Sequence, residues 1–360
     1  MEEAVWRPSP DRIRGAKLTK FMGWLRQRSS VHVSTYDELY RWSVDHPEQF
    51  WPALWDYCGV EASHPWEAVL DEERRMPGAR WFHGARLNFA ENLLLHDDER
   101  LAIVAWTEAG PLRRLTHHQL RVEVARLAAA LAGIGVGAGD RVAGFLPNIP
   151  EAIIAMLAAA SLGAVWSSCS PDFGLEGVLD RFGQIEPRVL FAADGYRWAG
   201  KTIDVLPRVA AIAEGLPSVE RVVVVPHLAA EPDLASVPHA VSWNAFVTPA
   251  APATSESVPL DFVQLPFDHP LYILYSSGTT GLPKCMVHGA GGTLLQHLKE
   301  LVLHTDVGPE DKVFYYTTCG WMMWNWLASG LASGATLLLY DGSPFHPDGN
   351  AIFDFAAAEK

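Results

Sequence analysis

Cysteine is scarce in this sequence of 360 residues, which contains only Cys58, Cys169, Cys285 and Cys319. None of them forms a C-x-x-C pair or stands at zinc spacing from a histidine, so neither a disulfide framework nor a structural metal site is predicted. This usage fits a reducing compartment, and we expect a cytoplasmic protein. Long apolar runs are also lacking. The most apolar stretch, 152–166, falls short of the ~20 residues that span a bilayer and predicts a buried helix that runs into a strand.

Basic residues are outnumbered, because 28 Lys and Arg stand against 42 Asp and Glu, which gives a formal net charge of −14. A protein that binds the phosphate backbone of nucleic acids needs a basic surface, so no nucleic-acid partner is expected. Any anionic ligand must instead be held by a local group of side chains. Wholesale disorder is excluded, because 49% of the residues are hydrophobic and only 19% are charged. The N-terminus is acidic and lacks the basic and apolar regions of a signal peptide.

Residues 1–95 predict an N-terminal helical region. Thr35 and Glu38 form a capping box at the start of a helix over 36–44, and Gly59 is expected to end the helix that follows. A second capping box, further along the chain, opens a helix that continues to Leu131 and precedes a run of glycines.

From residue 96 onward, short apolar runs alternate with helical periodicity, which is typical of a mainly parallel sheet with crossover helices. The Pro, Ala and Ser residues of 248–259 predict a linker, so we expect 96–258 to form a first α/β subdomain and 259–360 to begin a second, truncated one. The predicted strands cover 141–146, 164–168, 189–193, 221–225, 271–275, 312–316 and 335–340, and the further helices cover 151–162, 175–185, 202–214, 321–331 and 352–360.

The segment Tyr275–Lys284 reads YSSGTTGLPK and is the most informative part of the chain. Its residues 276–284 follow an apolar strand and combine four Ser and Thr hydroxyls, two glycines and one lysine. Glycines let backbone N–H groups turn toward oxygens, hydroxyls donate hydrogen bonds, and lysine supplies charge, so the segment predicts a loop that binds a polyphosphate. It does not fit the Walker A pattern G-x-x-x-x-G-K-[ST]. The alternative is a solvated hairpin turn between two strands.

This segment resembles the signature loop of the adenylate-forming superfamily, which includes acyl-CoA synthetases, peptide-synthetase adenylation domains and luciferases. That loop reads approximately [YF]-[ST]-S-G-T-T-G-x-P-K-G, and the one departure is Cys285 in place of the last glycine. The resemblance implies the large N-terminal domain of the adenylate-forming fold, with mainly parallel sheets flanked by helices and incomplete at the C-terminus. It also implies a two-step reaction in which ATP converts a carboxylate to an acyl-adenylate and coenzyme A then displaces AMP.

The resemblance further implies which residues bind ATP. Mg²⁺ is expected to bridge phosphate oxygens with few protein ligands, and no metal-binding side chains are assigned. Lys284 and Thr279 are the residues expected to act in catalysis, mainly by positioning and charge stabilisation. The expected phosphate-binding set is Ser276, Ser277, Gly278, Thr279, Thr280, Gly281 and Lys284.

Four segments outside the signature loop are most similar to the acyl-CoA synthetases that act on acetoacetate. These segments are 6–25, 87–93, 170–174 and 319–326. This similarity implies an acyl pocket formed by Gly320, Trp321, Met322, Met323, Trp324 and Asn325. A β-keto acid needs an apolar wall and one donor for its keto oxygen, which Asn325 or a tryptophan N–H could supply. Two alternatives remain: the Trp and Met side chains merely pack a core, or the substrate is another short acid such as acetate, propionate or a hydroxy acid.

Arg197 and Lys201 resemble a coenzyme A contact of related synthetases, although two ordinary surface cations would fit as well. We expect His117 and His118 to be solvated, and His288 to be packed or near the nucleotide.

The superfamily's adenine-binding, ribose-binding and C-terminal lysine segments are not found in the sequence. We therefore expect the chain to be the first part of a ligase, inactive alone and with uncovered sheet edges. A catalytically dead nucleotide-binding fragment is the alternative from another class. The substrates expected are acetoacetate, ATP and coenzyme A, and the sequence identifies no obligate protein partner.

Overall fold

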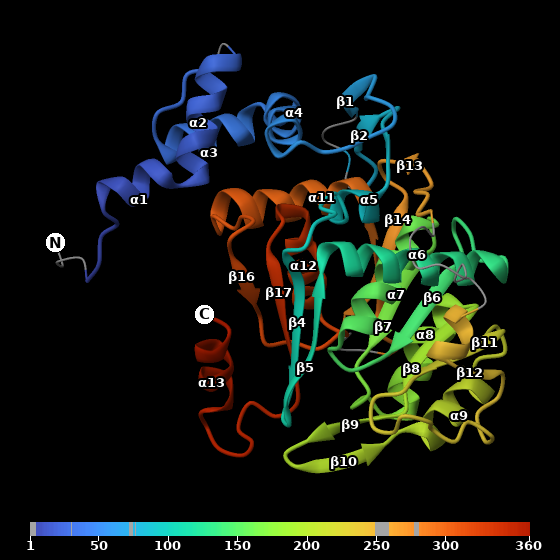
Figure 1. The fold of residues 1–360 in the computed structure, drawn as a ribbon. Helices are drawn as coiled ribbons and strands as arrows, with labels where there is room; N and C mark the ends of the chain where they lie inside the picture. The colour runs from blue at the N-terminus through green and yellow to red at the C-terminus, as the bar shows by residue number, and fades with distance from the viewer. Residues whose placement is uncertain (1–4, 30, 72–74, 76, 249–258, 277–280) are drawn as a thin grey trace.

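The computed structural model describes residues 5–29, 31–71, 75, 77–248, 259–276 and 281–360. The predicted α/β class is confirmed, because a large, mainly parallel sheet and a smaller sheet are flanked by helices (Figure 1). The division of the chain into domains stays a prediction, since nearly all of the expected linker lies outside the described residues. Both sheets combine strands from before and after that linker.

The larger sheet has seven strands in the order β12-β11-β8-β6-β7-β14-β15. All its neighbouring strands are parallel except the antiparallel pair β14 and β15. Two predicted strands, β8 and β11, are confirmed at both ends. The strands are β12 (Ala240–Ser242), β11 (Arg221–Val225), β8 (Val189–Ala193), β6 (Arg141–Phe145), β7 (Val165–Cys169), β14 (Pro270–Ser276) and β15 (Lys284–Gly289).

The smaller sheet has the order β16-β17-β4-β5, with β4 and β5 as an antiparallel hairpin at one edge. The sequence predicted β16 and β17 but did not indicate the hairpin of β4 and β5. The strands are β16 (Lys312–Phe314), β17 (Thr336–Asp341), β4 (Leu101–Thr107) and β5 (Gly110–Thr116).

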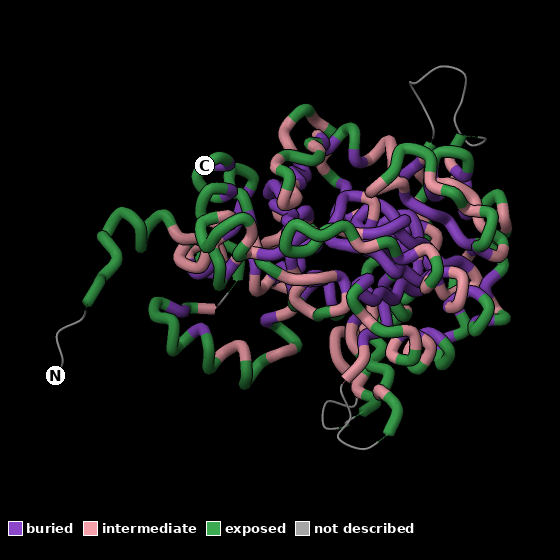
Figure 2. Tube along the Cα trace, turned by 90° about the horizontal axis from the view of Figure 1, so that it is seen from below, coloured by how far each residue is buried: buried purple, intermediate pink, exposed green. Residues whose placement is uncertain are grey.

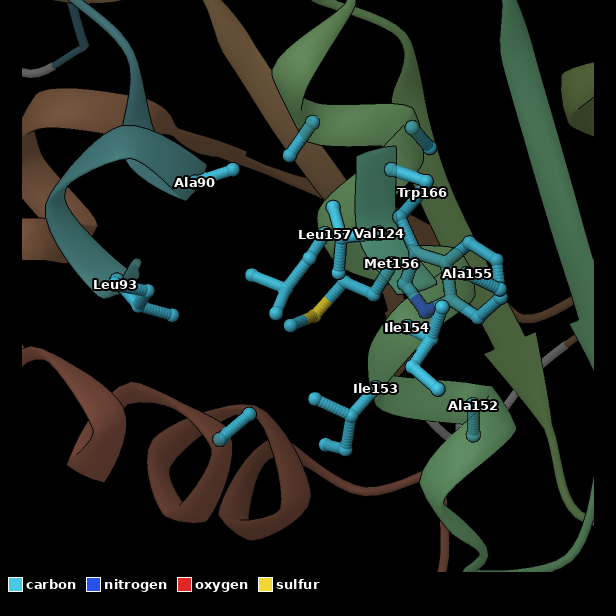
Figure 3. Packing of buried hydrophobic residues seen from close by; sticks show 14 of the residues in the cluster. Ala90, Leu93, Val124, Ala152, Ile153, Ile154, Ala155, Met156, Leu157 and Trp166 are labelled. Carbon is cyan, nitrogen blue, oxygen red and sulfur yellow. The ribbon is translucent and has the colours of Figure 1, made fainter. Parts of the chain in front are cut away.

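The helix α7 (Pro150–Ser161) lies in the core shared by the two sheets. Every residue from Ala152 to Ser161 is buried, as the continuous apolar run predicts, and the helix packs with Leu93 and Val124 from its neighbours (Figure 3). The core joins it to the helices α5 (Phe89–Leu93) and α6 (His117–Gly133). A helix that is apolar on all sides is stable only where other structure covers it.

The opposite face of the large sheet is covered by α8 (Leu175–Ile185) and α9 (Leu206–Gly215). Successive residues of β8 point to opposite faces of the sheet. Phe191 packs in the core with α7, whereas Leu190 packs with α8 and α9. Burial on both faces explains why these strands read as continuous apolar runs rather than as alternating patterns.

The N-terminal helices form an arm that extends from the body, and its first residues are exposed (Figures 1 and 2). The capping box of Thr35 and Glu38 is confirmed, and Gly59 ends the following helix in a left-handed conformation. The predicted helical region also contains three short strands that the sequence did not indicate. The elements are α1 (Pro10–Gly15), α2 (Lys17–Arg28), α3 (Tyr36–Asp45), α4 (Pro47–Cys58), β1 (Ala68–Asp71), β2 (Arg80–His83) and β3 (Arg86–Leu87).

Two sequence predictions were wrong. The helix expected over 202–214 begins only at Leu206, because residues before it form a hairpin of β9 (Gly195–Trp198) and β10 (Lys201–Asp204). His117, expected to be solvated, is 1% exposed and lies against His96, with ring centroids 5.4 Å apart.

The remaining elements connect or cover the sheets. A π-helical turn over Lys299–His304 continues α11, and a 3-10 turn over Ser329–Ser333 continues α12. No helix within the described ranges is long and apolar enough to cross a membrane. These elements are α10 (Trp243–Val247), β13 (Leu265–Pro266), α11 (Ala290–Leu298), α12 (Met322–Ala328) and α13 (Ala351–Ala358).

The buried histidine of α11 predicts a loss of stability in acid. His297 is 3% exposed, and burial lowers its pKa to about 4. In the unfolded chain its pKa is about 6.5, so the unfolded state takes up the proton first and stability falls as the pH drops from about 6.5 toward 4. We expect His297→Gln to lose about 2 kcal/mol less than the parent between pH 7 and pH 5, measured by urea denaturation. The exposed His118→Gln is the control, and equal acid losses in His297→Gln and the parent would contradict the prediction.

Candidate active site

The predicted phosphate loop connects the antiparallel strands β14 and β15. Ser276 ends β14, Lys284 begins β15, and these two residues face each other in the ladder. Gly281 has a φ of +93°, a conformation that glycine adopts without strain. The predicted ligands Ser277, Gly278, Thr279 and Thr280 lie outside the described residues. The antiparallel pairing of β14 and β15 is compatible with both interpretations of the segment, and the phosphate-binding roles stay a prediction.

Both ends of this loop are tied to neighbouring elements. At the end of β14, the hydroxyl of Ser167 on β7 donates a hydrogen bond of 3.1 Å to the phenol oxygen of Tyr275. Before β15, the side-chain amide of Gln184 on α8 donates a hydrogen bond of 2.9 Å to the carbonyl of Pro283. Burial raises the pKa of Tyr275, so its hydroxyl stays neutral. The exposed side chain of Lys284 therefore extends from an anchored frame.

The turn 170–174, which follows β7, lies between the phosphate strand and the predicted acyl segment. A side chain at Gly320 would stand 3.6 Å from the ring of Phe173. On the other side, the guanidinium of Arg181 lies 4.8 Å from the ring centroid of Phe173 and 5.7 Å from that of Tyr275. Two intervening side chains therefore connect Gly320 to the end of β14, which brings the two predicted sites together at the carboxyl ends of the strands.

The structure divides the six predicted acyl-pocket residues between different environments. Trp321 is 63% exposed, while Met322 and Met323 are half-buried. Trp324 is fully buried, and its indole N–H donates a hydrogen bond of 3.0 Å to the side-chain oxygen of Asn148. That N–H is therefore not available as the keto-oxygen donor.

Asn325 is the other candidate donor named individually for this role, and the indole N–H of Trp321 also remains open. It is 2% exposed, and neither its amide nitrogen nor its amide oxygen has a hydrogen-bond partner in the described part of the chain. A buried amide without partners costs free energy of roughly 1–3 kcal/mol. Unlike Trp324, Asn325 thus retains its full capacity to bind a polar ligand.

Arg197 and Lys201 lie on the β9–β10 hairpin, but they do not share a face. Arg197 pairs with Thr202 and Lys201 pairs with Trp198, and directly paired residues of an antiparallel ladder point to the same side. The two cations are therefore on opposite sides of the hairpin and do not form one clamp. Coenzyme A binding by either residue stays a prediction.

Two site-forming residues escaped the sequence analysis. Asn148 also donates from its side chain to the carbonyl of Tyr340 and from its backbone to Asp341, each at 3.4 Å, so it connects the end of β17 to Trp324. Its only sequence signal is its position just after a predicted strand. Glu108, at the β4–β5 turn, accepts hydrogen bonds from three backbone N–H groups far away in the chain, and no local pattern marks it.

A search of the described residues finds no group of three or more His, Cys, Asp or Glu side chains arranged to hold a metal ion. All four cysteines are free thiols. Cys285, which departs from the superfamily signature, is exposed on β15, and its backbone pairs with Tyr275 across the ladder.

The fold and these loops define an adenylate-forming domain, and comparison with known families agrees. The sequence model of AMP-binding enzymes matches residues 92–360, and that of the N-terminus of acetyl-coenzyme A synthetase matches residues 36–93. The chain therefore belongs to the AMP-binding enzyme family.

The chain is also similar to individual proteins and to a solved structure within this family. The chain is 50% identical over 360 residues to an acetoacetyl-coenzyme A synthetase of Rhizobium meliloti, covering 100% of this chain and 54% of that protein. It superimposes on the acetoacetyl-CoA synthetase from Streptomyces lividans with a TM-score of 0.91 and 44% identity, covering 99% of this chain and 54% of that one. It is also 44% identical to a malonamoyl-CoA synthetase of Penicillium aethiopicum, over 96% of this chain and 48% of that protein. The chain spans about half the length of the curated relatives it matches.

The contacts of Glu108 generate a prediction about the hairpin. Burial alone would raise the pKa of Glu108, but the N–H groups of Gly200, Ser343 and Ala199 lower it overall, so the carboxylate is the bound form. Glu108→Gln replaces one acceptor oxygen with a donor. We expect amide exchange at Ala199, Gly200 and Ser343 to accelerate about tenfold, measured by hydrogen exchange. The exposed Glu99→Gln is the control, and unchanged protection in Glu108→Gln would refute the anchoring role.

Proposed function

We propose that this chain provides the ATP-binding part of an AMP-forming ligase that joins acetoacetate to coenzyme A. The observation that carries the proposal is the proximity of Gly320 to Phe173, which lies against Arg181 and so leads to Tyr275, because this places the acyl segment near the strand before the phosphate loop. The acetoacetyl-CoA synthetases among the relatives support the same reaction. Cytoplasmic location is part of this proposal.

The proposed reaction has an adenylyl-transfer step followed by an acyl-transfer step. An oxygen of the acetoacetate carboxylate attacks the α-phosphorus of ATP, and pyrophosphate leaves; the thiol of coenzyme A then attacks the acyl carbon, and AMP leaves with the electron pair of the broken C–O bond. The chain's contribution is to bind and orient charged groups, because no covalent enzyme intermediate is required. Lys284 would pair with the terminal phosphates, together with the hydroxyls of Ser276, Ser277, Thr279 and Thr280.

Magnesium would enter with ATP as a complex with its phosphate oxygens. Mg²⁺ keeps several water ligands and commonly binds through one or two carboxylates plus substrate phosphates. In that role the ion would neutralise the developing charge on pyrophosphate.

Asn325 would select the acyl group. Acetoacetyl and malonamoyl groups both carry a carbonyl at the β position, and synthetases named for these two groups are comparably similar to this chain. An amide N–H aimed at that carbonyl would serve either acid and disfavour a plain acyl chain, which leaves the donor unpaired. The malonamoyl-CoA relative makes a β-amide acid the second candidate substrate.

The phosphate role of Lys284 is testable on the 360-residue chain. We expect Lys284→Ala to weaken binding of MgATP about tenfold to hundredfold in calorimetric titration, because a charge-assisted hydrogen bond is removed. Lys20→Ala, at an exposed position of α2, is the matched control and should bind like the parent. Equal affinities for the parent and Lys284→Ala would rule out this role.

The proposed role of Asn325 predicts opposite effects on stability and selectivity. Asn325→Leu removes an unpaired buried amide, so we expect the chain to become more stable in urea denaturation. In the ligase that contains these residues, the preference in kcat/KM for acetoacetate over butyrate should fall at least about tenfold. A gain in stability with unchanged acid preference would mean that Asn325 does not contact the acyl group.

A further inference from the structure

A cavity of about 420 Å³ lies at the carboxyl end of β11, and none of the residues predicted to bind phosphate, acyl group or coenzyme A lines it. Its walls come from β5, α6, the first turn of α7, the end of β11 and α10. Crevices outside the carboxyl ends of parallel strands are the usual ligand sites of open α/β sheets, and this volume is in the range of small-molecule sites. The lining residues are Arg113, Glu123, Arg126, Glu151, Val225, Pro226, Trp243, Asn244 and Val247.

One side of the cavity is a charged network with unused acceptors. Arg113 donates to Oε1 of Glu151 at 2.7 Å and also forms an ion pair with Oε1 of Glu123. The second oxygen of each glutamate receives no hydrogen bond from the described residues. Burial raises the pKa of Glu123, and the neighbouring arginines only partly offset it. Another cationic donor in the cavity would therefore stabilise the ionised network.

Arg126 supplies the unused donors. Its Nε is buried without a hydrogen-bond partner, and its guanidinium makes no hydrogen bond or ion pair with the described residues. The guanidinium is nevertheless close enough to Glu123 to lower that residue's pKa. A buried guanidinium nitrogen without an acceptor is costly, and its fork geometry suits a carboxylate.

The other side of the cavity is apolar. Val225, Pro226, Trp243 and Val247 contribute carbon surface, and Trp243 is 8% exposed. The cavity therefore offers a carboxylate-binding fork, carboxylates that accept from a cation, and a wall for a hydrocarbon group. Its two arginines and two glutamates sum to zero formal charge, so a ligand without net charge adds no unbalanced charge.

We propose that this cavity binds a free α-amino acid with an apolar side chain. Its carboxylate pairs with Arg126, its ammonium group with the second oxygens of Glu151 and Glu123, and its side chain packs against the wall of Val225 and Val247. Inorganic phosphate fits less well, because its charge would lie beside two carboxylates. A simple amine leaves Arg126 unpaired, and a simple carboxylic acid leaves the glutamates unpaired. The inference is independent of the proposed ligase activity.

Calorimetric titration of the 360-residue chain with L-leucine tests the proposal. We expect leucine to bind, glycine to bind at least about tenfold more weakly because it buries no side chain, and 4-methylpentanoate and 3-methylbutylamine each to bind at least about tenfold more weakly than leucine. These two compounds lack only the ammonium and only the carboxylate, respectively. Failure of leucine to bind, or equal binding of either analogue, overturns the proposal. Phosphate that binds as tightly as leucine also overturns it.

Variants of the lining residues assign the binding to this cavity. Arg126 makes no hydrogen bond or ion pair with the described residues, so Arg126→Gln should keep the parent's melting temperature while weakening leucine binding at least about tenfold, and Arg126→Lys should be intermediate. The exposed Arg12→Gln is the control and should bind like the parent. If Arg126→Gln binds leucine normally, the proposal fails. If Arg126→Gln is instead unstable, Arg126→Lys decides: undiminished affinity overturns the site, and weakened affinity with a native melting temperature supports it.

Discussion

The burial of α7 on every side is the constraint on which the rest of the structure depends. A helix without a polar face has no stable position at a surface, so both sheets and the neighbouring helices must cover it. Each large apolar side chain that it buries contributes roughly 1.5–3 kcal/mol. Because α7 is the crossover between the parallel strands β6 and β7, the carboxyl ends of both strands lie at the same edge of the sheet. The loops at their carboxyl ends are thereby directed to one edge of the molecule.

At this edge, the predicted phosphate loop and the predicted acyl segment, which are far apart in the sequence, are connected by few side chains. Phe173 is the central one, because its ring lies against Arg181 and borders the space beside Gly320 that a side chain there would enter. Asn148 performs a similar task on the other side, where it connects β17 to Trp324. These residues act as positioning groups. Their packing holds the loop ends, while the loops keep the glycines and hydroxyls that a nucleotide requires.

Most of the fold could be predicted from local patterns wherever the pattern and the burial agree. The capping box at Thr35 and the apolar runs of β8 and β11 gave correct boundaries, because caps and strands buried on both faces have strong local signals. The β9–β10 hairpin was missed because its turn requires a positive φ at Ala199, which an alanine does not indicate. His117 was misjudged because the capping box marks where α6 begins but not that His96 covers it.

The candidate site was less evenly predictable. The loop before Lys284 is recognisable in the sequence because its signature consists of local residue types and their spacing. Glu108 and Asn148 could not be found in that way, since their partners lie far away in the chain and are mostly backbone groups that carry no sequence signal. For Arg197 and Lys201, the sequence suggested a shared contact with coenzyme A. The two-residue turn instead places the two side chains on opposite faces of the hairpin.

The strands that flank the predicted phosphate loop bear on the proposed role of Lys284 in a protein with a net charge of −14. A Walker A loop leads directly into a helix, whose N-terminus supplies partial positive charge and free N–H groups to the phosphates. Here the loop leads into β15, an edge strand, and a strand contributes almost no net dipole. In the proposed function, the attraction for a polyphosphate would therefore come from the loop's own donors, from Lys284 and from Arg181, whose guanidinium lies 5.7 Å from the ring centroid of Tyr275. In a protein with an excess of acidic residues, these groups would have to act together.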